Sequence, residues 1–391
     1  MSKHYNRTIY ACFTSFIVQA IINNFVPLLF LTFQRAYDIS LDQLALLITF
    51  NFGVQLLIDL LSSKFIDKIG YRISIIGAHI FAATGLLSLT ILPEIAPTPY
   101  IGIAISVMLY AVGGGLIEVL ASPIVEACPT EHKEGTMSLL HSFYCWGQVG
   151  VVLLSTLFFA VVGIDNWRWI SAFWALIPLC NAFAFTKVPI APLVEEGKGL
   201  SISELFRLKT FWVMVILMLC AGACELSVSQ WASAFTESAL GVSKTVGDLA
   251  GPAFFAICMG SARVYYAKHS TTIRLTDFML GSGILCVISY LLISLSPWPV
   301  LSFLGCGLCG LSVGILWPGT FSIAAKEIPT GGTALFALLA LAGDLGCSSG
   351  PTFVGFISSA FRDNLKVGIL FAVIFPLLLL IGLSLNKKLQ S

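Results

Sequence analysis

The segment that organises this sequence is Gly113-Gly114-Gly115-Leu116-Ile117-Glu118-Val119-Leu120-Ala121-Ser122-Pro123. It places one carboxylate inside a long apolar stretch, where an ionised group is costly and is a functional candidate by default. The three glycines allow another backbone to approach closely, and Ser122 lies one helical turn after Glu118 on the same face. We therefore expect this helix to line a cavity. A structural acid bonded to a neighbouring helix is the alternative for Glu118.

A second segment, Gly307-Leu308-Cys309-Gly310-Leu311-Ser312-Val313-Gly314-Ile315-Leu316-Trp317-Pro318, repeats the first one half of the chain later. Its proline lies 195 positions after Pro123. Val313 takes the place of the carboxylate, so we expect a titrating group only in the first copy of the segment. Trp317, beside Pro318, is a candidate stacking surface for a solute.

The composition is that of an integral membrane protein. Of 391 residues, 57% are hydrophobic and 10% charged, against about 25% charged residues in a soluble domain. A spanning helix needs about 20 apolar residues, and the sequence contains twelve such segments joined by short polar connections. We predict an all-α membrane protein with twelve transmembrane helices in two six-helix halves, and no soluble domain.

The charges set the orientation and exclude some functions. With both termini in the cytoplasm, sixteen of the 21 Lys and Arg residues lie inside, and the outside keeps Arg35, Arg168, Lys244, Arg362 and Lys366. The positive-inside rule favours this orientation in the cell membrane. The net charge of +1 gives no case for nucleic-acid binding. We expect no enzyme, metal or cofactor, because no nucleophile and base pair or ligand set is evident.

The eleven cysteines are scattered through apolar segments, so a disulfide framework is not expected. Cys306 and Cys309 form a C-x-x-C inside a G-x-G-x-x-G match. A dinucleotide fingerprint must follow a strand and open a helix, whereas this match lies inside a membrane helix. We interpret it as close helix packing.

The chain divides almost symmetrically at a polar segment. Residues 188–205 contain Pro189, Pro192, Gly197 and Gly199 and interrupt the apolar pattern. We predict an N-terminal six-helix bundle over residues 1–188, a cytoplasmic linker over 189–206 and a C-terminal six-helix bundle over 207–391.

Polar side chains recur at helical spacing in the N-terminal half. The first predicted helix, residues 8–34, carries Gln19 and Asn23 on one face with Asn24 beside them. The second, residues 41–64, has a polar stripe at four-residue spacing: Asn51, Gln55 and Asp59. Because unpaired amides are costly in hydrocarbon, we expect these groups to face a partner or a solute.

Further candidates lie in three other predicted helices. His141 and Gln148 share a face of residues 135–163, and His141 can accept or relay a proton near neutral pH or bond within a gate. The helix over residues 210–236 carries Glu225, Gln230 and Trp231, suited to a ring-shaped solute; Trp231 also fits an interfacial aromatic belt. Asp344, with Ser348 one turn on, lies in residues 333–358. Arg263 is expected in a basic loop.

The turn Ser62-Ser63-Lys64-Phe65-Ile66-Asp67-Lys68-Ile69-Gly70-Tyr71-Arg72 resembles the signature between helices 2 and 3 of the major facilitator superfamily, G-x-x-x-D-(R/K)-x-G-(R/x)-(R/K). Asp67, Lys68, Gly70 and Arg72 occupy matching places. An anion at a helix N-terminus and cations at the headgroups suit a conformational latch.

Within that superfamily the chain is similar to the fucose:proton symporter branch. The resemblance depends on Asn23-Asn24, on Glu118 with Ser122-Pro123, on Leu140-His141-Ser142-Phe143 with Gly147, and on Gly222 and Glu225 with Trp231. It implies that Glu118 is a proton-coupling carboxylate. The branch's aspartate in helix 1 is replaced by Val26-Pro27.

Our hypothesis is a monomeric secondary transporter in which the two halves rock about a site at the bilayer midplane and move a small polar solute, such as a sugar, with a proton. Low dielectric should keep Glu118 protonated at mild pH. The proton-coupling candidates are Glu118, Glu225, Asp344 and His141. The solute-binding candidates are Gln19, Asn23, Asn24, Gln55, Glu118, Ser122, His141, Gln148, Glu225, Gln230, Trp231, Trp317 and Asp344.

Two alternatives stay open. A proton-driven exporter of amphiphilic compounds shares the fold and the buried acids but prefers a more apolar cavity. A membrane sensor that transports nothing is the alternative from a different class, and the sequence offers no soluble signalling domain for it.

Overall fold

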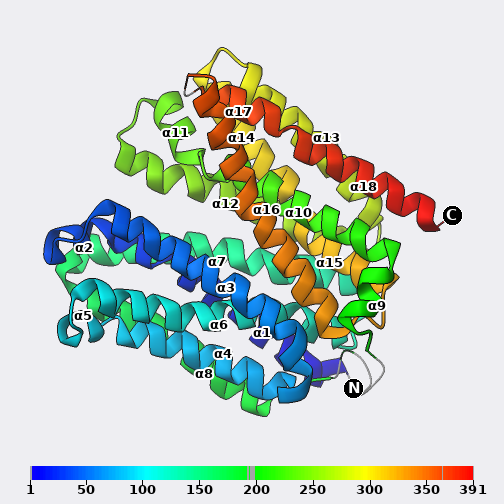
Figure 1. Ribbon diagram of the computed structural model, residues 1–391, viewed down its shortest axis with the longest axis horizontal. Helices are drawn as coiled ribbons and strands as arrows, with labels where there is room; N and C mark the ends of the chain where they lie inside the picture. The colour runs from blue at the N-terminus through cyan, green and yellow to red at the C-terminus, as the bar shows by residue number, and fades with distance from the viewer. Residues whose placement is uncertain (1, 192, 194–198, 363, 391) are drawn as a thin grey trace. The chain divides into compact units, whose positions relative to one another are not determined.

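The computed structural model describes the backbone of residues 2–191, 193, 199–362 and 364–390 (Figure 1). Within these ranges it describes all side chains except those of residues 2–4, 31, 41, 42, 45, 67, 234, 238, 239, 244, 245, 248 and 388–390. Every regular element in these ranges is a helix. The chain forms two compact units: unit 1 comprises residues 1–130 and 146–195, and unit 2 comprises residues 131–145 and 196–391. The domain boundaries predicted at 188 and 207 remain a prediction.

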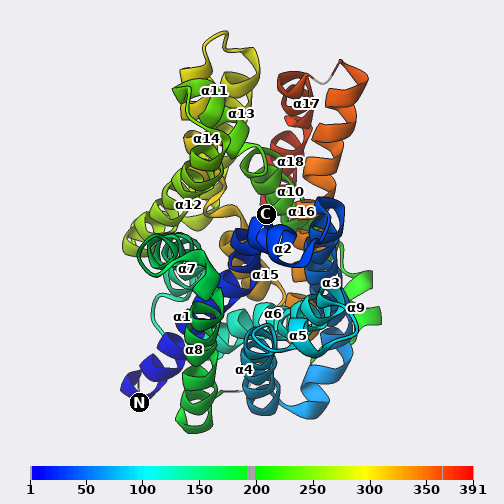
Figure 2. The same ribbon diagram turned by 90° about the vertical axis from the view of Figure 1, so that its left-hand side faces the viewer.

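Unit 1 is a bundle of long helices with short connecting ones. It contains α1 (Ser2–Asn24), η1 (Val26–Leu29), α2 (Phe30–Tyr37), α3 (Leu41–Ile69), α4 (Tyr71–Ser88), α5 (Leu92–Ile95), α6 (Pro99–Ala127), the part of α7 (Lys133–Val162) from residue 146, η2 (Ile164–Asn166) and α8 (Trp167–Lys187). Helices α4, α6 and α8 lie side by side (Figure 2). Ser40 begins α3 with a capping box and Thr98 caps α6, as short hydroxyl side chains do at helix starts.

Unit 2 is also a bundle of long helices with short connecting ones. It contains the first part of α7, then α9 (Ile202–Arg207), α10 (Lys209–Ser229), α11 (Ala232–Leu240), α12 (Lys244–His269), α13 (Leu275–Leu295), α14 (Pro299–Val313), α15 (Leu316–Glu327), α16 (Gly332–Ala360), α17 (Leu365–Ala372) and α18 (Ile374–Gln390). Helices α10 and α16 pack most extensively, because Gly222 and Gly346 bring the two backbones into direct contact.

Four of the predicted spans are interrupted, which the apolar pattern alone does not predict. α1 ends before Pro27, α14 and α15 are separated before Pro318, and α17 and α18 are separated before Pro376. Proline has no N–H for the carbonyl four residues earlier, and its ring clashes with that carbonyl. The fourth break, between α10 and α11, has no proline; there the Trp231 N–H donates to the Val228 carbonyl three residues back.

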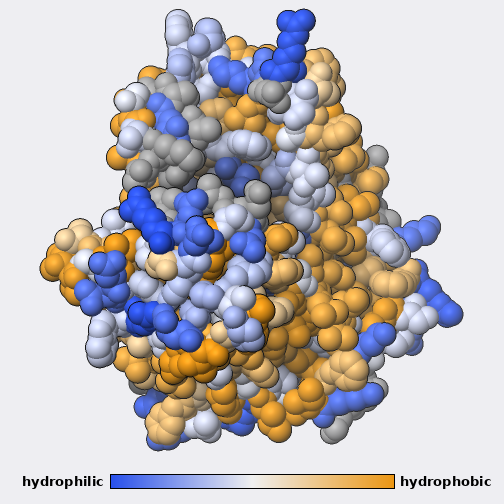
Figure 3. All heavy atoms as spheres, turned by 60° about the vertical axis from the view of Figure 1, so that its left-hand side comes forward, coloured by the Kyte–Doolittle hydropathy of each residue, from blue (hydrophilic) through white to orange (hydrophobic). Residues whose placement is uncertain are grey.

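The prediction of a multi-span membrane protein is confirmed. Among the described residues, eleven helical segments are long and apolar enough to span a bilayer. The twelfth predicted span corresponds to α12, which carries more charge, Arg263 and Lys268 among them. Figure 3 shows a broad hydrophobic area on the drawn face, with hydrophilic residues gathered on either side of it.

Candidate functional site

The three glycines of α6 let two neighbouring helices approach the carboxylate-bearing segment. A Cβ atom at Gly113 would lie 2.5 Å from the carbonyl oxygen of Ala78 in α4, and one at Gly115 would lie 2.9 Å from the Ile58 Cβ and 3.0 Å from the carbonyl oxygen of Gln55 in α3. A side chain at either position would therefore force its neighbours to shift, which glycine avoids. The predicted close approach of another backbone is thus present on two sides.

Glu118 belongs to a hydrogen-bonded group of side chains from α1, α3 and α6 that we call the amide network: Gln19, Asn23, Asn51, Gln55 and Glu118. The Gln19 Nε2 donates to Glu118 Oε2 at 3.1 Å and to Gln55 Oε1 at 2.9 Å. The Gln55 and Asn51 amides both donate to Asn23 Oδ1 at 3.0 Å. Side chains separated by up to 99 positions in the sequence therefore form one connected network.

Two acceptor oxygens of the amide network have no hydrogen bond in the described part of the chain. They are Gln19 Oε1 and Asn51 Oδ1, and both side chains are at most 5% exposed. An unpaired buried acceptor costs about 1–3 kcal/mol. These oxygens therefore provide places where a hydroxyl or water donor would be stabilised.

The end of α1 sets the geometry of the amide network. α1 ends at Asn24, directly after Asn23 and shortly before Pro27. The Asn24 amide donates to the Ala20 carbonyl of its own helix at 2.8 Å. Asn24, a predicted solute-binding residue, is thus occupied in closing the last turn of α1, whereas Asn23 joins the network.

A second buried polar cluster lies in unit 2 around Arg263. Its Nε donates to the Gly314 carbonyl at 2.7 Å, and its Nη1 donates to the His141 carbonyl at 2.8 Å and to Cys145 Sγ at 3.1 Å. Its Nη2 lies 3.7 Å from Glu225 Oε2. Arg263 is 3% exposed and lies inside α12, so the prediction that it belongs to a loop is wrong.

Arg263 was not predicted as a functional candidate because α12 extends to His269, further than its apolar pattern indicates. A lone arginine six positions inside a membrane helix is the signal that could have identified it. Two predicted residues, His141 and Glu225, are joined through this arginine. The ring of His141 also packs 5.9 Å from that of Phe321.

The other predicted site residues lie in varied surroundings. Ser122 is fully buried in α6, and Gln148 is half-buried in the unit 1 part of α7. Gln230 is exposed at the end of α10, and the half-buried Trp231 follows it. Trp317 is 8% exposed, and its ring packs against the backbone of Gly343 in α16. Asp344 is half-buried, and its carbonyl accepts from Ser348.

The predicted conformational latch is partly described. Gly70 joins α3 to α4 with a φ of +90°, which favours glycine. Arg72 donates to the carbonyls of Phe185 and Val188 at the end of α8, at 2.5 and 3.0 Å, where a cation is favoured by the helix dipole. Lys68 is exposed, and the side chain of Asp67 lies outside the described residues. The latch role stays a prediction.

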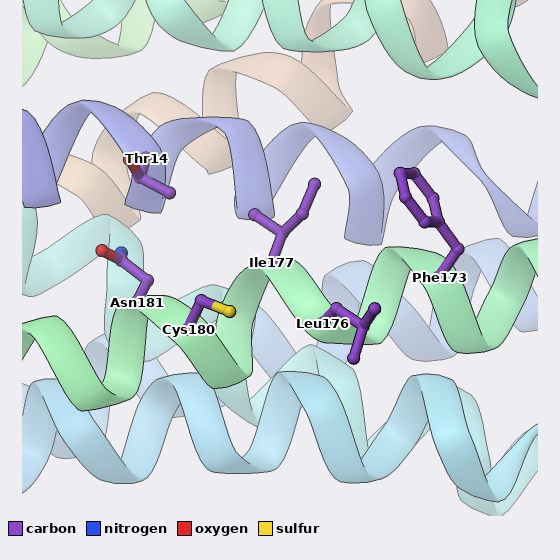
Figure 4. Close-up of a pocket in the computed structure, with 6 residues that line it drawn as sticks. All are labelled: Thr14, Phe173, Leu176, Ile177, Cys180 and Asn181. Carbon is purple, nitrogen blue, oxygen red and sulfur yellow. The ribbon is translucent and has the colours of Figure 1, made fainter.

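A surface groove of about 330 Å³ lies apart from the amide network, between α1 and α8 (Figure 4). Its lining is mostly apolar: Thr14, Phe173, Leu176, Ile177, Cys180 and Asn181. The Asn181 amide is occupied by the Ala11 carbonyl at 2.9 Å and by His79 Nε2 at 2.8 Å. His79 is in turn bonded within the fold, through Asn181 and the Ile75 carbonyl, and we do not assign the groove to a polar solute.

Comparisons with known proteins agree with this architecture. The family profile described as Major Facilitator Superfamily matches residues 11–351. No curated protein matches the chain. Among solved structures, the fold is similar to that of FucP, a Major Facilitator Superfamily transporter in the outward conformation, with 16% identity, coverage of 97% of this chain and 98% of that one, and a TM-score of 0.83.

Two further structures give the same result. A variant of the E. coli fucose:proton symporter FucP is 17% identical, with coverage of 98% and 99% and a TM-score of 0.80. The proton:xylose symporter XylE, bound to 6-bromo-6-deoxy-D-glucose, is 12% identical, with coverage of 97% and 95% and a TM-score of 0.83. At these identities the likeness concerns the fold alone, and it confirms the predicted fold class.

Proposed function

We propose that this chain, which belongs to the major facilitator superfamily, moves a small hydroxylated solute across the cell membrane together with a proton, by alternating access. Its family and fold are those of transporters and not of enzymes. The solute class, the coupling ion and the orientation with both termini in the cytoplasm are our proposals. So is a monomeric state.

The observation that carries the proposal is the pair of unbonded acceptors in the amide network. Gln19 Oε1 and Asn51 Oδ1 are buried and, within the described residues, accept no hydrogen bond. A solute with several hydroxyl groups can donate to both oxygens and recover the cost of burying them. An apolar or cationic amphiphile offers no such set of donors, so the network favours a sugar or a related polyol over the export of amphiphilic compounds.

The same network suits a proton-coupled site. The Gln19 amide has both a donor and an acceptor, and its Nε2 already donates to Glu118. After rotation of the amide, Oε1 can accept from a protonated Glu118 carboxyl. Gln19 can therefore bond to either charge state of Glu118, and the rotation exchanges its bond to Gln55 Oε1 for the bond from the protonated acid.

The structural neighbours support the same class of solute, since they include a fucose:proton symporter and a proton:xylose symporter. Their identities to this chain are 17% or lower. The proposal of a hydroxylated solute therefore depends on the amide network, and the neighbours agree with it.

Uptake into proteoliposomes tests the proposal. Purified protein would be presented with labelled sugars, organic acids and lipophilic cations under an imposed pH gradient, acidic outside. We expect accumulation of at least one hydroxylated solute, abolished by a protonophore. Movement of lipophilic cations alone would contradict the solute class, and accumulation that survives the protonophore would contradict proton coupling.

A matched pair of variants then tests the amide network. Asn51→Leu removes one of the two unbonded acceptors and should raise KM about tenfold, the equivalent of one lost hydrogen bond to a solute. Asn386→Leu is the control, because Asn386 in α18 also has a buried Oδ1 without a hydrogen bond among the described residues but lies in unit 2, outside the network. Equal KM values for the two variants would count against the network as a solute site.

A further inference from the structure

Arg263 is the most heavily engaged cation in the described part of unit 2. Its guanidinium contacts three other helical segments: α7 through His141 and Cys145, the α14–α15 break through Gly314, and α10 through Glu225. Guanidinium has five N–H donors and no acceptor, so a single arginine can bind several carbonyls at once. A buried charge is costly unless it is paired and hydrogen-bonded, and Arg263 is 3% exposed.

The Gly314 carbonyl is available to Arg263 because of Pro318. In an uninterrupted helix, this carbonyl would accept from the N–H of residue 318, which proline lacks. The helix is broken at Gly314–Ile315 and resumes with Gly319 donating to Ile315 at 2.8 Å. Arg263 Nε, at 2.7 Å, takes the place of the missing donor. A buried carbonyl without a hydrogen-bond donor is thereby avoided.

The first part of α7 is joined to α12 by further contacts. Ser138 Oγ donates to the Arg263 carbonyl at 2.8 Å, and Tyr266 Oη donates to Glu134 at 2.9 Å. Gly135 faces the Ala267 carbonyl and Ser270 closely enough that a Cβ atom would collide with them. Bonds in both directions thus hold residues 131–145 against α12.

The boundary between the two units falls within α7, directly after Cys145. α7 contributes residues 131–145 to unit 2 and the rest of its length to unit 1. Alternating access requires the halves of a carrier to move relative to one another, so contacts made by a helix that contributes to both units are candidates for release. Arg263 contacts the last residue of α7 that belongs to unit 2.

We propose that Arg263 is a positioning residue for the transport cycle. It is a releasable clasp that holds residues 131–145 of α7 against α12 and the α14–α15 break, and Glu225 is its counter-ion. The inference rests on the proposed function, since only a transport cycle would require release. Arg263 belongs to unit 2 and the amide network to unit 1, so the clasp should govern the rate of transport and not the affinity for the solute.

Reactivity of the Cys145 thiol gives a test that needs no solute. Cys145 is buried and bonded to Arg263, so alkylation by N-ethylmaleimide, quantified by peptide mass spectrometry, reports opening of the clasp. In Arg263→Lys, a single ammonium cannot span the same carbonyls, and we expect Cys145 to react at least about tenfold faster. Cys12, buried in unit 1, serves as the internal control and should react at the wild-type rate.

A second variant keeps the arginine and changes only the donors available to its partner, the Gly314 carbonyl. Pro318→Ala restores an N–H that competes with Arg263 for the Gly314 carbonyl, and should accelerate Cys145 alkylation by less than Arg263→Lys does. Arg274→Lys is the surface control, because Arg274 pairs only with the exposed Asp277 of its own helix start among the described residues. Equal acceleration at Cys12 and Cys145 would indicate general unfolding and overturn the proposal.

With a transported solute identified, Arg263→Lys should change the maximal rate several-fold while KM stays near the wild-type value. A wild-type alkylation rate at Cys145 in Arg263→Lys would refute the clasp even if the chain transports a sugar. If Cys145 alkylation is faster in Arg263→Lys but no transported solute is found, the clasp is supported and the proposed function fails independently of it.

Discussion

Two half-buried acids, one in each unit, have different partners. Glu118 of unit 1 accepts a hydrogen bond from the neutral amide of Gln19 at 3.1 Å, whereas Glu225 of unit 2 lies 3.7 Å from the guanidinium of Arg263. An amide can both donate and accept, so it can bond to either form of an acid. An arginine only donates, so it favours the ionised form. We infer that Glu118 is the acid that carries the proton and that Glu225 serves as the partner of Arg263.

The same contrast separates the two copies of the repeated segment. Both copies contain a proline, at 123 in α6 and at 318 in α15. α6 continues through Pro123 and carries Glu118, whereas the second copy is broken at Gly314–Ile315 and has Val313 in place of the acid. One copy therefore provides a titratable group, and the other provides a free carbonyl for Arg263 to bind.

The largest expected effect is on stability, and it distinguishes the two acids. Glu225→Gln removes the charge that faces a buried arginine, and breaking a buried ion pair from one side costs about 3–5 kcal/mol. Glu118→Gln keeps a group that can bond to Gln19 and should change the free energy of unfolding by less than about 1 kcal/mol. Thermal unfolding of both variants in detergent measures this difference. Equal destabilisation would remove the distinction between the acids.

The next largest effect is on solute affinity, and it compares one amide side chain from each unit. Gln55 accepts from Gln19 and donates to Asn23, so Gln55→Leu breaks two bonds of the amide network. We expect an affinity loss of about 1–3 kcal/mol in solute binding. Gln230→Leu, at the exposed end of α10, should cost less. Titration of a transported solute with both variants tests this order, and a greater loss from Gln230→Leu would move the solute site to unit 2.

A smaller effect is expected at the glycines. A Cβ atom at Gly114 would lie 3.1 Å from Gln19 Oε1, so Gly114→Ala should displace the amide network by a few tenths of an ångström and raise KM about threefold, near 0.7 kcal/mol. Gly53→Ala is the control, because nothing lies within 4 Å of a Cβ atom there. It should leave KM unchanged and stabilise α3 by up to about 1 kcal/mol. Identical KM values for the two variants would contradict the role of Gly114.

The smallest effect is expected at Asn24, although its neighbour Asn23 joins the network. The Asn24 amide bonds to the Ala20 carbonyl within α1, so Asn24→Ala should change KM less than twofold, within about 0.4 kcal/mol. Transport kinetics of this variant check the assignment. A loss as great as that of Gln55→Leu would bring Asn24 back into the site.

Much of the fold and part of the site follow from local patterns. Apolar length predicts the spans, and the four-residue spacing of Asn51 and Gln55 places their amides on one face of α3, where both bond to Asn23. The glycines before Glu118 predict close helix approach, and the distances at Gly113 and Gly115 agree with it. Such features are visible because the residue types themselves carry the physical constraint.

The cluster around Arg263 could not be predicted in the same way. Two of its partners, His141 and Gly314, contribute backbone carbonyls, which every residue has and which leave no mark in a sequence. The arginine is also close to Lys268 and His269 at the end of α12, so it resembles the start of a basic loop. Only Pro318 indicated that a carbonyl would lose its partner.

The role of Glu118 as the proton carrier is tested most directly by proton movement during downhill solute influx. In proteoliposomes with a pH-sensitive dye in the outer medium, wild-type protein should make that medium more alkaline when the solute is added. Glu118→Gln should move the solute inward at a comparable rate with no change in outer pH. Proton uptake by Glu118→Gln at the wild-type ratio of protons to solute would contradict the role of Glu118 as the proton carrier.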